Sequence, residues 1–81
     1  MIAMKRRVKL TFPQVLIKEP VIFTMAKKYN VMPNIRRARV TETVGEMILE
    51  IEGQEESVLA AIEELKVQGV DVELAEGDVF E

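Results

Sequence analysis

Few side chains in this 81-residue sequence could carry out chemistry. Histidine and cysteine are absent, and Ser57 is the only serine. A nucleophile activated by a histidine base, a disulfide, and a metal site of thiolates or imidazoles are therefore excluded. The fourteen acidic residues are spread along predicted exposed faces, so we interpret them as solvated charge and not as general acids or bases. We expect a protein that is not an enzyme and that uses no metal and no cofactor.

The stretch "VMPNIRRARV" contains the best candidate for a binding residue. Asn34 lies at the mouth of an expected strand, where its amide could bind the amino or carboxylate group of a small ligand. Ile35, Met32 and two residues of an apolar first loop, Leu16 and Ile17, would form a recess beside it, and few polar groups in an apolar concavity are typical of ligand sites. Alternatively, Asn34 satisfies only local backbone groups and Ile35 is a packing residue.

The periodicity of apolar residues indicates the elements that position this stretch. Alternation in "KRRVKLTF" predicts a strand that Pro13 ends, and helical spacing in "VIFTMAKKY" predicts a helix that Asn30 ends. Gly69 marks the end of a second helix. In the second strand, Ala38 and Val40 are expected on the core face. We expect strands at about 5–12, 34–43, 46–52 and 70–74, and helices at about 20–29 and 55–68.

The order of these elements is β-α-β-β-α-β. With right-handed crossovers it predicts an α+β fold, the ferredoxin-like (ACT-like) sandwich, with an antiparallel sheet of order 4-1-3-2 and two helices on one face. Residues 1–81 are expected to form one domain, with a core at about 4–75 and a polar tail at 76–81. No apolar run approaches the roughly 18 residues that span a membrane, and no signal peptide is evident, so we expect a cytoplasmic protein.

The charge is divided unevenly along the chain. Residues 1–40 carry a net charge of +9 and residues 41–81 a net charge of −12. The predicted strand order alternates acidic and basic strands, so the two halves would neutralise each other across the sheet. RNA binding is disfavoured because the central strands show no outward aromatic residue for stacking on bases. Arg7 and Lys9 are expected beside acidic neighbours such as Glu50, Glu52, Asp71 and Glu73.

A second copy of the chain is the expected source of additional stability. A core of this size is small, and without cysteine no disulfide can reinforce it. By parity, Ile48 and Ile35 face away from the helices, where a homodimer contact would cover them.

Five segments together resemble a known family: "VKLTF", "EPVIFTMAKKYNV", "NIRRARV", "VGEMILEIEG" and "AAIEELKVQGVDVE". From about Arg7 to Glu73 the chain resembles the NIL domain, the C-terminal regulatory domain of the ATPase subunit of bacterial methionine importers. The resemblance implies an ACT-like fold that dimerises and binds methionine as a regulatory ligand. Similar domains occur fused to iron–sulfur ferredoxins and as stand-alone proteins, and we expect this chain to be of the stand-alone kind.

The resemblance also implies site residues. The asparagine and isoleucine of the family's motif correspond to Asn34 and Ile35, whereas the third position, usually leucine, is Arg36. We therefore expect ligand binding by Asn34, Ile35, Leu16, Ile17, Met32 and Arg36. The expected function is a regulatory module that binds an amino acid such as L-methionine at a dimer-associated site and modulates a separate transporter or ferredoxin-type enzyme. The alternative, which Arg36 favours, is a protein–protein adaptor with a degenerate pocket.

Overall fold

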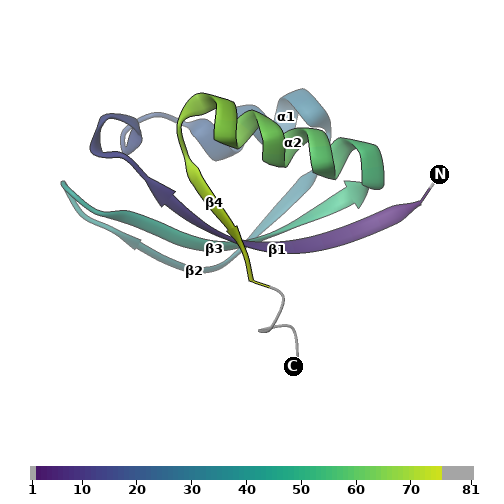
Figure 1. Cartoon of the computed structure of the whole chain (residues 1–81), viewed down its shortest axis with the longest axis horizontal. Helices are drawn as coiled ribbons and strands as arrows, with labels where there is room; N and C mark the ends of the chain where they lie inside the picture. The colour runs from purple at the N-terminus through teal and green to yellow at the C-terminus, as the bar shows by residue number, and fades with distance from the viewer. Residues whose placement is uncertain (1, 76–81) are drawn as a thin grey trace.

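The computed structural model describes residues 2–75, and it places a four-stranded sheet beneath a layer of two helices (Figure 1). The predicted polar tail, 76–81, lies outside the described residues. The shortest extent of the Cα trace is 16 Å, which fits one sheet and one helix layer. The elements are β1 (Ala3–Phe12), a 3-10 turn η1 (Gln14–Leu16), α1 (Val21–Tyr29), β2 (Met32–Val40), β3 (Gly45–Gln54), α2 (Glu55–Gln68) and β4 (Asp71–Leu74).

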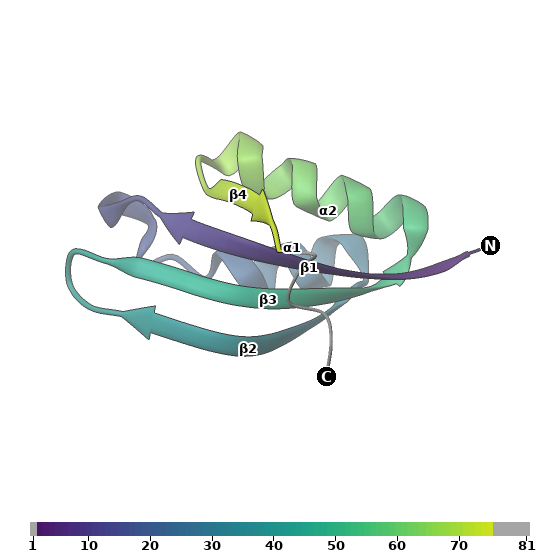
Figure 2. The ribbon, with the colours of Figure 1, turned by 60° about the horizontal axis from the view of Figure 1, so that its bottom comes forward.

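The sheet has the predicted topology. Its strand order is β2-β3-β1-β4, which is the predicted order 4-1-3-2 read from the other edge of the sheet. Each pair of neighbouring strands is antiparallel. Figure 2 shows this order, with β2 along one edge and the short β4 along the other. The chain reaches β2 from β1 through α1, and reaches β4 from β3 through α2. The ferredoxin-like α+β fold is thus confirmed.

The core lies between the two central strands and the helices. In β1, alternation buries Val8 and Leu10 completely, and in β3 it buries Leu49 and Ile51. The apolar stripe of α2 packs onto this face of the sheet, as its helical spacing predicts. The buried apolar residues are Val8, Leu10, Met25, Val31, Leu49, Ile51, Val58, Ala61, Ile62, Leu65 and Val70.

Both helices end at a residue in the left-handed conformation. Asn30 has φ 58° and Gly69 has φ 103°. At Gly69 the backbone N–H donates to carbonyls of the last helical turn, and Val70 N–H donates to the Leu65 carbonyl at 3.0 Å. Asparagine and glycine are the residues that tolerate this backbone conformation best, so both predicted helix ends are confirmed.

The hairpin of β2 and β3 differs from its predicted limits. β2 runs over Met32–Val40 and not over 34–43, because the backbone N–H of Thr43 and of Val44 donate to Thr41 Oγ1 and form the turn there. Pro33 is tolerated within β2 because, among residues 2–75, this strand is at the edge of the sheet and pairs only with β3.

Candidate functional site

The predicted binding stretch lies on an irregular part of β2. Ile35 pairs with Leu49 and Arg37 pairs with the preceding residue of β3, Ile48, so Arg36 is an extra residue without a partner in the ladder. Such a β-bulge changes which face of the sheet the following residues occupy. The sequence motif "NIR" therefore includes the one position at which β2 and β3 fall out of simple alternation.

The bulge corrects the predicted orientation of Ile35. Residues that pair across an antiparallel ladder lie on the same face, and Leu49 is buried beneath the helices. Ile35 thus lies on the helix side of the sheet, and the prediction that it faces away was wrong because it assumed unbroken alternation. Ile48 pairs with Lys9 and lies on the open face, as predicted.

The other apolar residues of β2 are on the predicted side but are not buried. Ala38 pairs with Met47 and Val40 pairs with Gly45, both on the helix side. Ile35 is nevertheless 57% exposed and Val40 58% exposed. In the described part of the chain, the helix layer does not cover this edge of the sheet, which leaves a row of apolar side chains beside a strand edge that no other described strand pairs with.

Asn34 and Met32 lie on the open face, opposite Glu50 and Glu52. The Glu50 carboxylate accepts two hydrogen bonds from the Arg7 guanidinium, at 2.7 Å from Nη2 and 3.2 Å from Nε. This hydrogen-bonded pair lowers the pKa of Glu50, and Arg36 adds a smaller electrostatic contribution in the same direction. Glu50 is therefore ionised at neutral pH, and the predicted alternation of charge between β1 and β3 is confirmed here.

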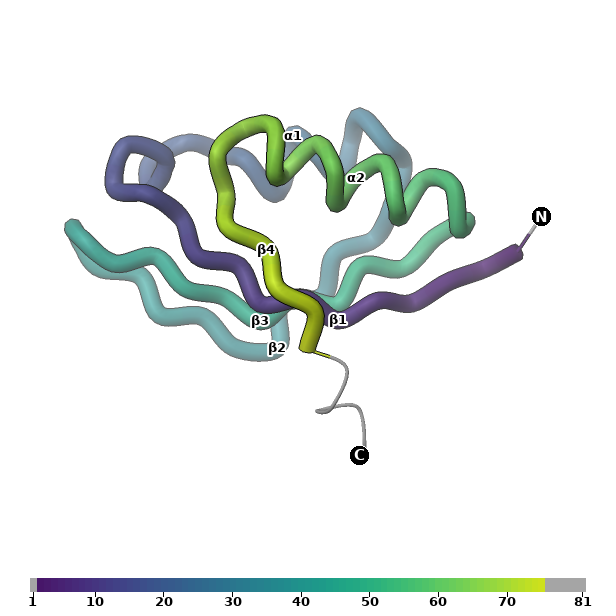
Figure 3. The backbone as a smooth tube through the Cα atoms, in the orientation of Figure 1, coloured from purple at the N-terminus to yellow at the C-terminus, as the bar shows by residue number. Residues whose placement is uncertain are grey.

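The two remaining predicted residues, Leu16 and Ile17, lie in the first loop, Pro13–Pro20. Figure 3 shows that this loop curls over the end of the sheet at which β2 and β3 are joined. Gly45 permits the contact, because a Cβ built there would lie 3.3 Å from Ile17 Cγ1 and 3.2 Å from Phe12 Cβ. Between the loop, α1 and the hairpin is an apolar cavity of about 150 Å³, the loop cavity, whose lining includes Phe12, Leu16, Ile17, Phe23, Val40 and Met47.

A single chain separates the predicted site residues into two groups. Ile17 lies next to Gly45, and Leu16 lines the same loop cavity. Asn34 lies opposite Glu50, five residues further along β3 and thus roughly 17 Å from Gly45. The lining residues Phe23 and Val40 were not among the predicted site residues. One signal of the bulge was present in the sequence. The apolar residues of β2 switch from an odd position at Ile35 to even positions at Ala38 and Val40, which is the change that one extra residue in a strand produces.

Neither helix within residues 2–75 combines the length and the apolar character that a membrane-crossing helix requires.

Comparison with known proteins agrees with this geometry. The family model of the NIL domain matches residues 6–74. Among solved structures, the chain is similar to the crystal structure of the C-terminal domain of an ABC transporter ATP-binding protein from Enterococcus faecalis. The TM-score is 0.78 and the sequence identity is 30%, covering 85% of this chain and 81% of that chain. No curated protein matches the sequence. The chain belongs to the NIL domain family.

Proposed function

We propose that this NIL domain is a regulatory module that binds an amino acid, with L-methionine as the first candidate, and acts on a separate transporter ATPase or ferredoxin-type enzyme. The similarity to the C-terminal domain of a transporter ATP-binding protein supports an association with transport. The "NI" pair at Asn34 and Ile35, in the position of the family's motif, supports the amino-acid ligand.

One observation carries the location of the site. The two groups of predicted residues lie toward opposite ends of β2, and β2 is an edge strand of the sheet that the described residues form. If two copies pair antiparallel through β2 about its middle, the start of one strand lies beside the end of the other. The start of β2 in one copy then approaches the end of β2 in the other copy, where Val40 lines the same loop cavity as Ile17. Pairing of two copies thus reunites residues that one chain keeps apart.

Five of the six predicted residues have a role in this arrangement. Ile35, on the helix side and more than half exposed, would cover the loop cavity of the other copy and form an apolar wall with its Leu16 and Ile17. Asn34 would donate and accept hydrogen bonds at the polar head of the ligand. Arg36, displaced from the ladder by the bulge, would bind the ligand carboxylate through a charge-assisted hydrogen bond.

The test is thermal unfolding, followed by circular dichroism, with each amino acid in turn. A ligand present at about 100 times its dissociation constant stabilises the folded state by about 2.7 kcal/mol. For a domain of this size that corresponds to roughly 10 °C or more in Tm. We expect such a shift with L-methionine and its loss in Asn34→Ala. The matched control is Gln54→Ala, which removes another exposed amide near a strand end and should keep the shift.

The outcomes separate the two functions considered for this chain. A shift that Asn34→Ala abolishes and Gln54→Ala retains supports the amino-acid site. If no amino acid shifts the Tm, the proposal fails and the adaptor function is favoured. A shift with an amino acid other than methionine would support the site if Asn34→Ala abolishes it, and Arg36 would then be the first residue to substitute in tests of specificity.

A further inference from the structure

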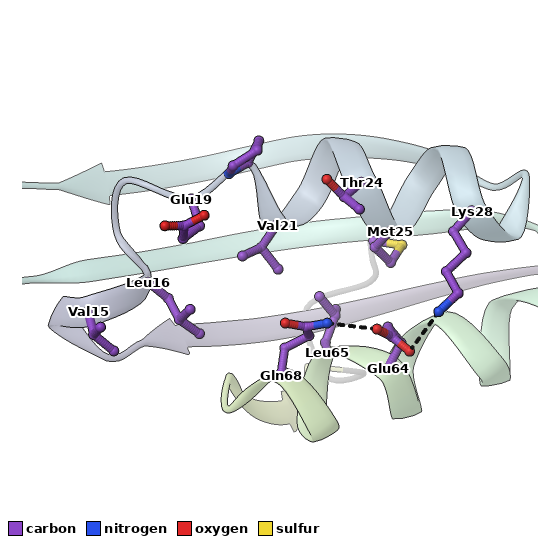
Figure 4. Close-up of a pocket in the computed structure, with 11 residues that line it drawn as sticks. Val15, Leu16, Glu19, Val21, Thr24, Met25, Lys28, Glu64, Leu65 and Gln68 are labelled. Atoms are coloured by element: carbon purple, nitrogen blue, oxygen red, sulfur yellow. Dashed lines mark hydrogen bonds and ion pairs between the residues drawn. The ribbon is translucent and has the colours of Figure 1, made fainter.

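A larger cavity lies on the other side of the first loop, between α1 and α2, and we call it the interhelix cavity. Its volume is about 440 Å³, within the range of small-molecule sites. The first loop, α1 and α2 all contribute to its lining. Figure 4 shows the side chains converging on it from these three elements. Its apolar surface comes from Leu16, Val21, Met25 and Leu65, of which Met25 and Leu65 are anchored in the core.

A cation and an anion lie side by side at one end of the interhelix cavity. Lys28 Nζ of α1 is 3.5 Å from Glu64 Oε1 of α2. The Glu64 carboxylate also accepts hydrogen bonds from Gln68 Nε2 at 2.8 Å and from the Tyr29 hydroxyl at 3.0 Å. These bonds, with the charge of Lys28, lower the pKa of Glu64, so its carboxylate is ionised at neutral pH.

Within the part of the chain that the structure describes, both charged groups keep unused hydrogen-bonding capacity. A carboxylate offers about four acceptor positions, and the three contacts above leave one at Glu64. An ammonium group has three donors; among residues 2–75, Lys28 contacts the Glu64 carboxylate and lies 5.4 Å from the centroid of the Tyr29 ring, which leaves at least one donor for a ligand. In Figure 4 the side-chain oxygen of Gln68 points away from Glu64, and the Glu19 carboxylate faces the cavity from the loop. The polar groups can therefore bind a second pair of opposite charges.

We propose that the interhelix cavity is an amino-acid site contained within one chain, and that it takes an α-amino acid with an apolar side chain. Lys28 would bind the α-carboxylate. Glu64, with the Gln68 oxygen, would bind the α-ammonium group. The side chain would extend along Leu16, Val21 and Met25. An adjacent cation and anion above an apolar surface complement the head and the side chain of such a ligand together, whereas a simple amine or a simple acid would satisfy only one charge.

This site is distinct from the one under Proposed function. It shares the loop residue Leu16 with that site, but it uses no residue of β2 and needs no second copy, because the first loop, α1 and α2 of one chain supply its lining. Asn34 is not part of it, so Asn34→Ala is a control here although it is the decisive variant for the other site. The two proposals can therefore fail separately.

The test is a titration of the isotope-labelled protein, followed by backbone amide NMR. The probes are L-leucine, 3-methylbutylamine, which lacks the carboxylate, and 4-methylpentanoate, which lacks the amine. We expect saturable shifts with L-leucine at Thr24, Lys28, Leu65 and Gln68. We expect each truncated probe to bind at least about tenfold more weakly, the effect of losing about 1.4 kcal/mol of contact.

Paired variants test the roles of the charges. Lys28→Gln and Glu64→Gln should each weaken L-leucine binding at least about tenfold. Their controls are the neighbouring substitutions Lys27→Gln and Glu63→Gln, which remove the same charges outside the interhelix cavity and should change nothing. Lys28 is well exposed, so Lys28→Gln remains informative even if Glu64→Gln weakens the fold.

Three results would overturn the proposal. The first is the absence of saturable shifts at these residues with L-leucine at about 10 mM, a concentration that fills about nine-tenths of a site with a dissociation constant of about 1 mM. The second is an equal loss of affinity in Lys27→Gln and Lys28→Gln. The third is binding of 3-methylbutylamine as tight as that of L-leucine, which would show a site for cations alone.

Discussion

Pairing of two copies through β2 predicts a specific effect of Val40→Lys. Val40 is 58% exposed on an edge strand whose helix-side neighbour Ile35 is equally exposed, so both would be covered in a dimer. A lysine on an edge strand opposes strand addition, because its charge would have to be desolvated against the other copy. It would also add a cation to a strand that already carries three arginines. The substitution should leave the folded monomer intact, since it changes a side chain outside the core.

The magnitude follows from the exposed fraction. Complete burial of a valine side chain contributes about 1.5–3 kcal/mol, so covering the remaining part of Val40 is worth about 1 kcal/mol. A twofold dimer contains this contact twice, so Val40→Lys removes about 2 kcal/mol before any charge repulsion. The dissociation constant of the dimer should therefore rise at least roughly 30-fold.

The measurement is sedimentation velocity over a concentration series. Val67→Lys is the matched control, because Val67 is 80% exposed on α2 and lies away from β2. It should leave the dissociation constant unchanged. A wild-type chain that stays monomeric throughout, or an equal effect of the two lysines, would refute pairing through β2.

The other predictions concern stability. Gly69→Ala forces alanine to φ 103° and should lower the free energy of unfolding by about 1–2 kcal/mol, measured as a lower urea midpoint with an unchanged m-value. Gly69→Asn should recover part of this loss, because Asn30 already adopts a left-handed conformation in this protein. Leu49→Ala empties a fully buried position and should cost about 2–5 kcal/mol in the same assay. The pKa of Glu50 in the folded protein lies below its ordinary value of 4.5, so the ionised carboxylate stabilises the fold at every pH above 4.5. This contribution is lost as the pH falls from 4.5 through the lowered pKa of the folded state. Urea midpoints of Glu50→Gln should therefore fall less steeply with acid than those of the wild type.

Most of the fold was predictable because several independent signals agreed. Alternation of apolar residues in β1 and β3 and their helical spacing in α2 each indicate one buried face. Asn30 and Gly69, which tolerate the left-handed conformation, mark the ends of the two helices. Charge then favours a single strand order, since it brings Arg7 beside Glu50. The fold therefore rests on local patterns that tolerate a shift of two or three residues at the ends of an element.

The candidate site was predicted less well because it depends on single-residue geometry. One extra residue at Arg36 moves Ile35 to the opposite face, and simple parity does not anticipate it. The interhelix cavity depends on how α1 and α2 approach each other, which brings Lys28 near Glu64 from distant parts of the sequence. The spacing of Glu64 and Gln68, four residues apart on one helix, was the only local sign of that cluster.

The hydrogen bond between Tyr29 and Glu64 makes the intrinsic tyrosine fluorescence of this protein sensitive to the contact between α1 and α2. The sequence contains one tyrosine and no tryptophan, so its ultraviolet emission comes almost entirely from Tyr29. The hydroxyl of that ring is bonded to a carboxylate at 3.0 Å where α1 meets α2. Any event that separates the two helices or draws Glu64 toward another group will change the environment of this single fluorophore. Helix separation and occupancy of the cavity can therefore be followed in real time on the unlabelled chain.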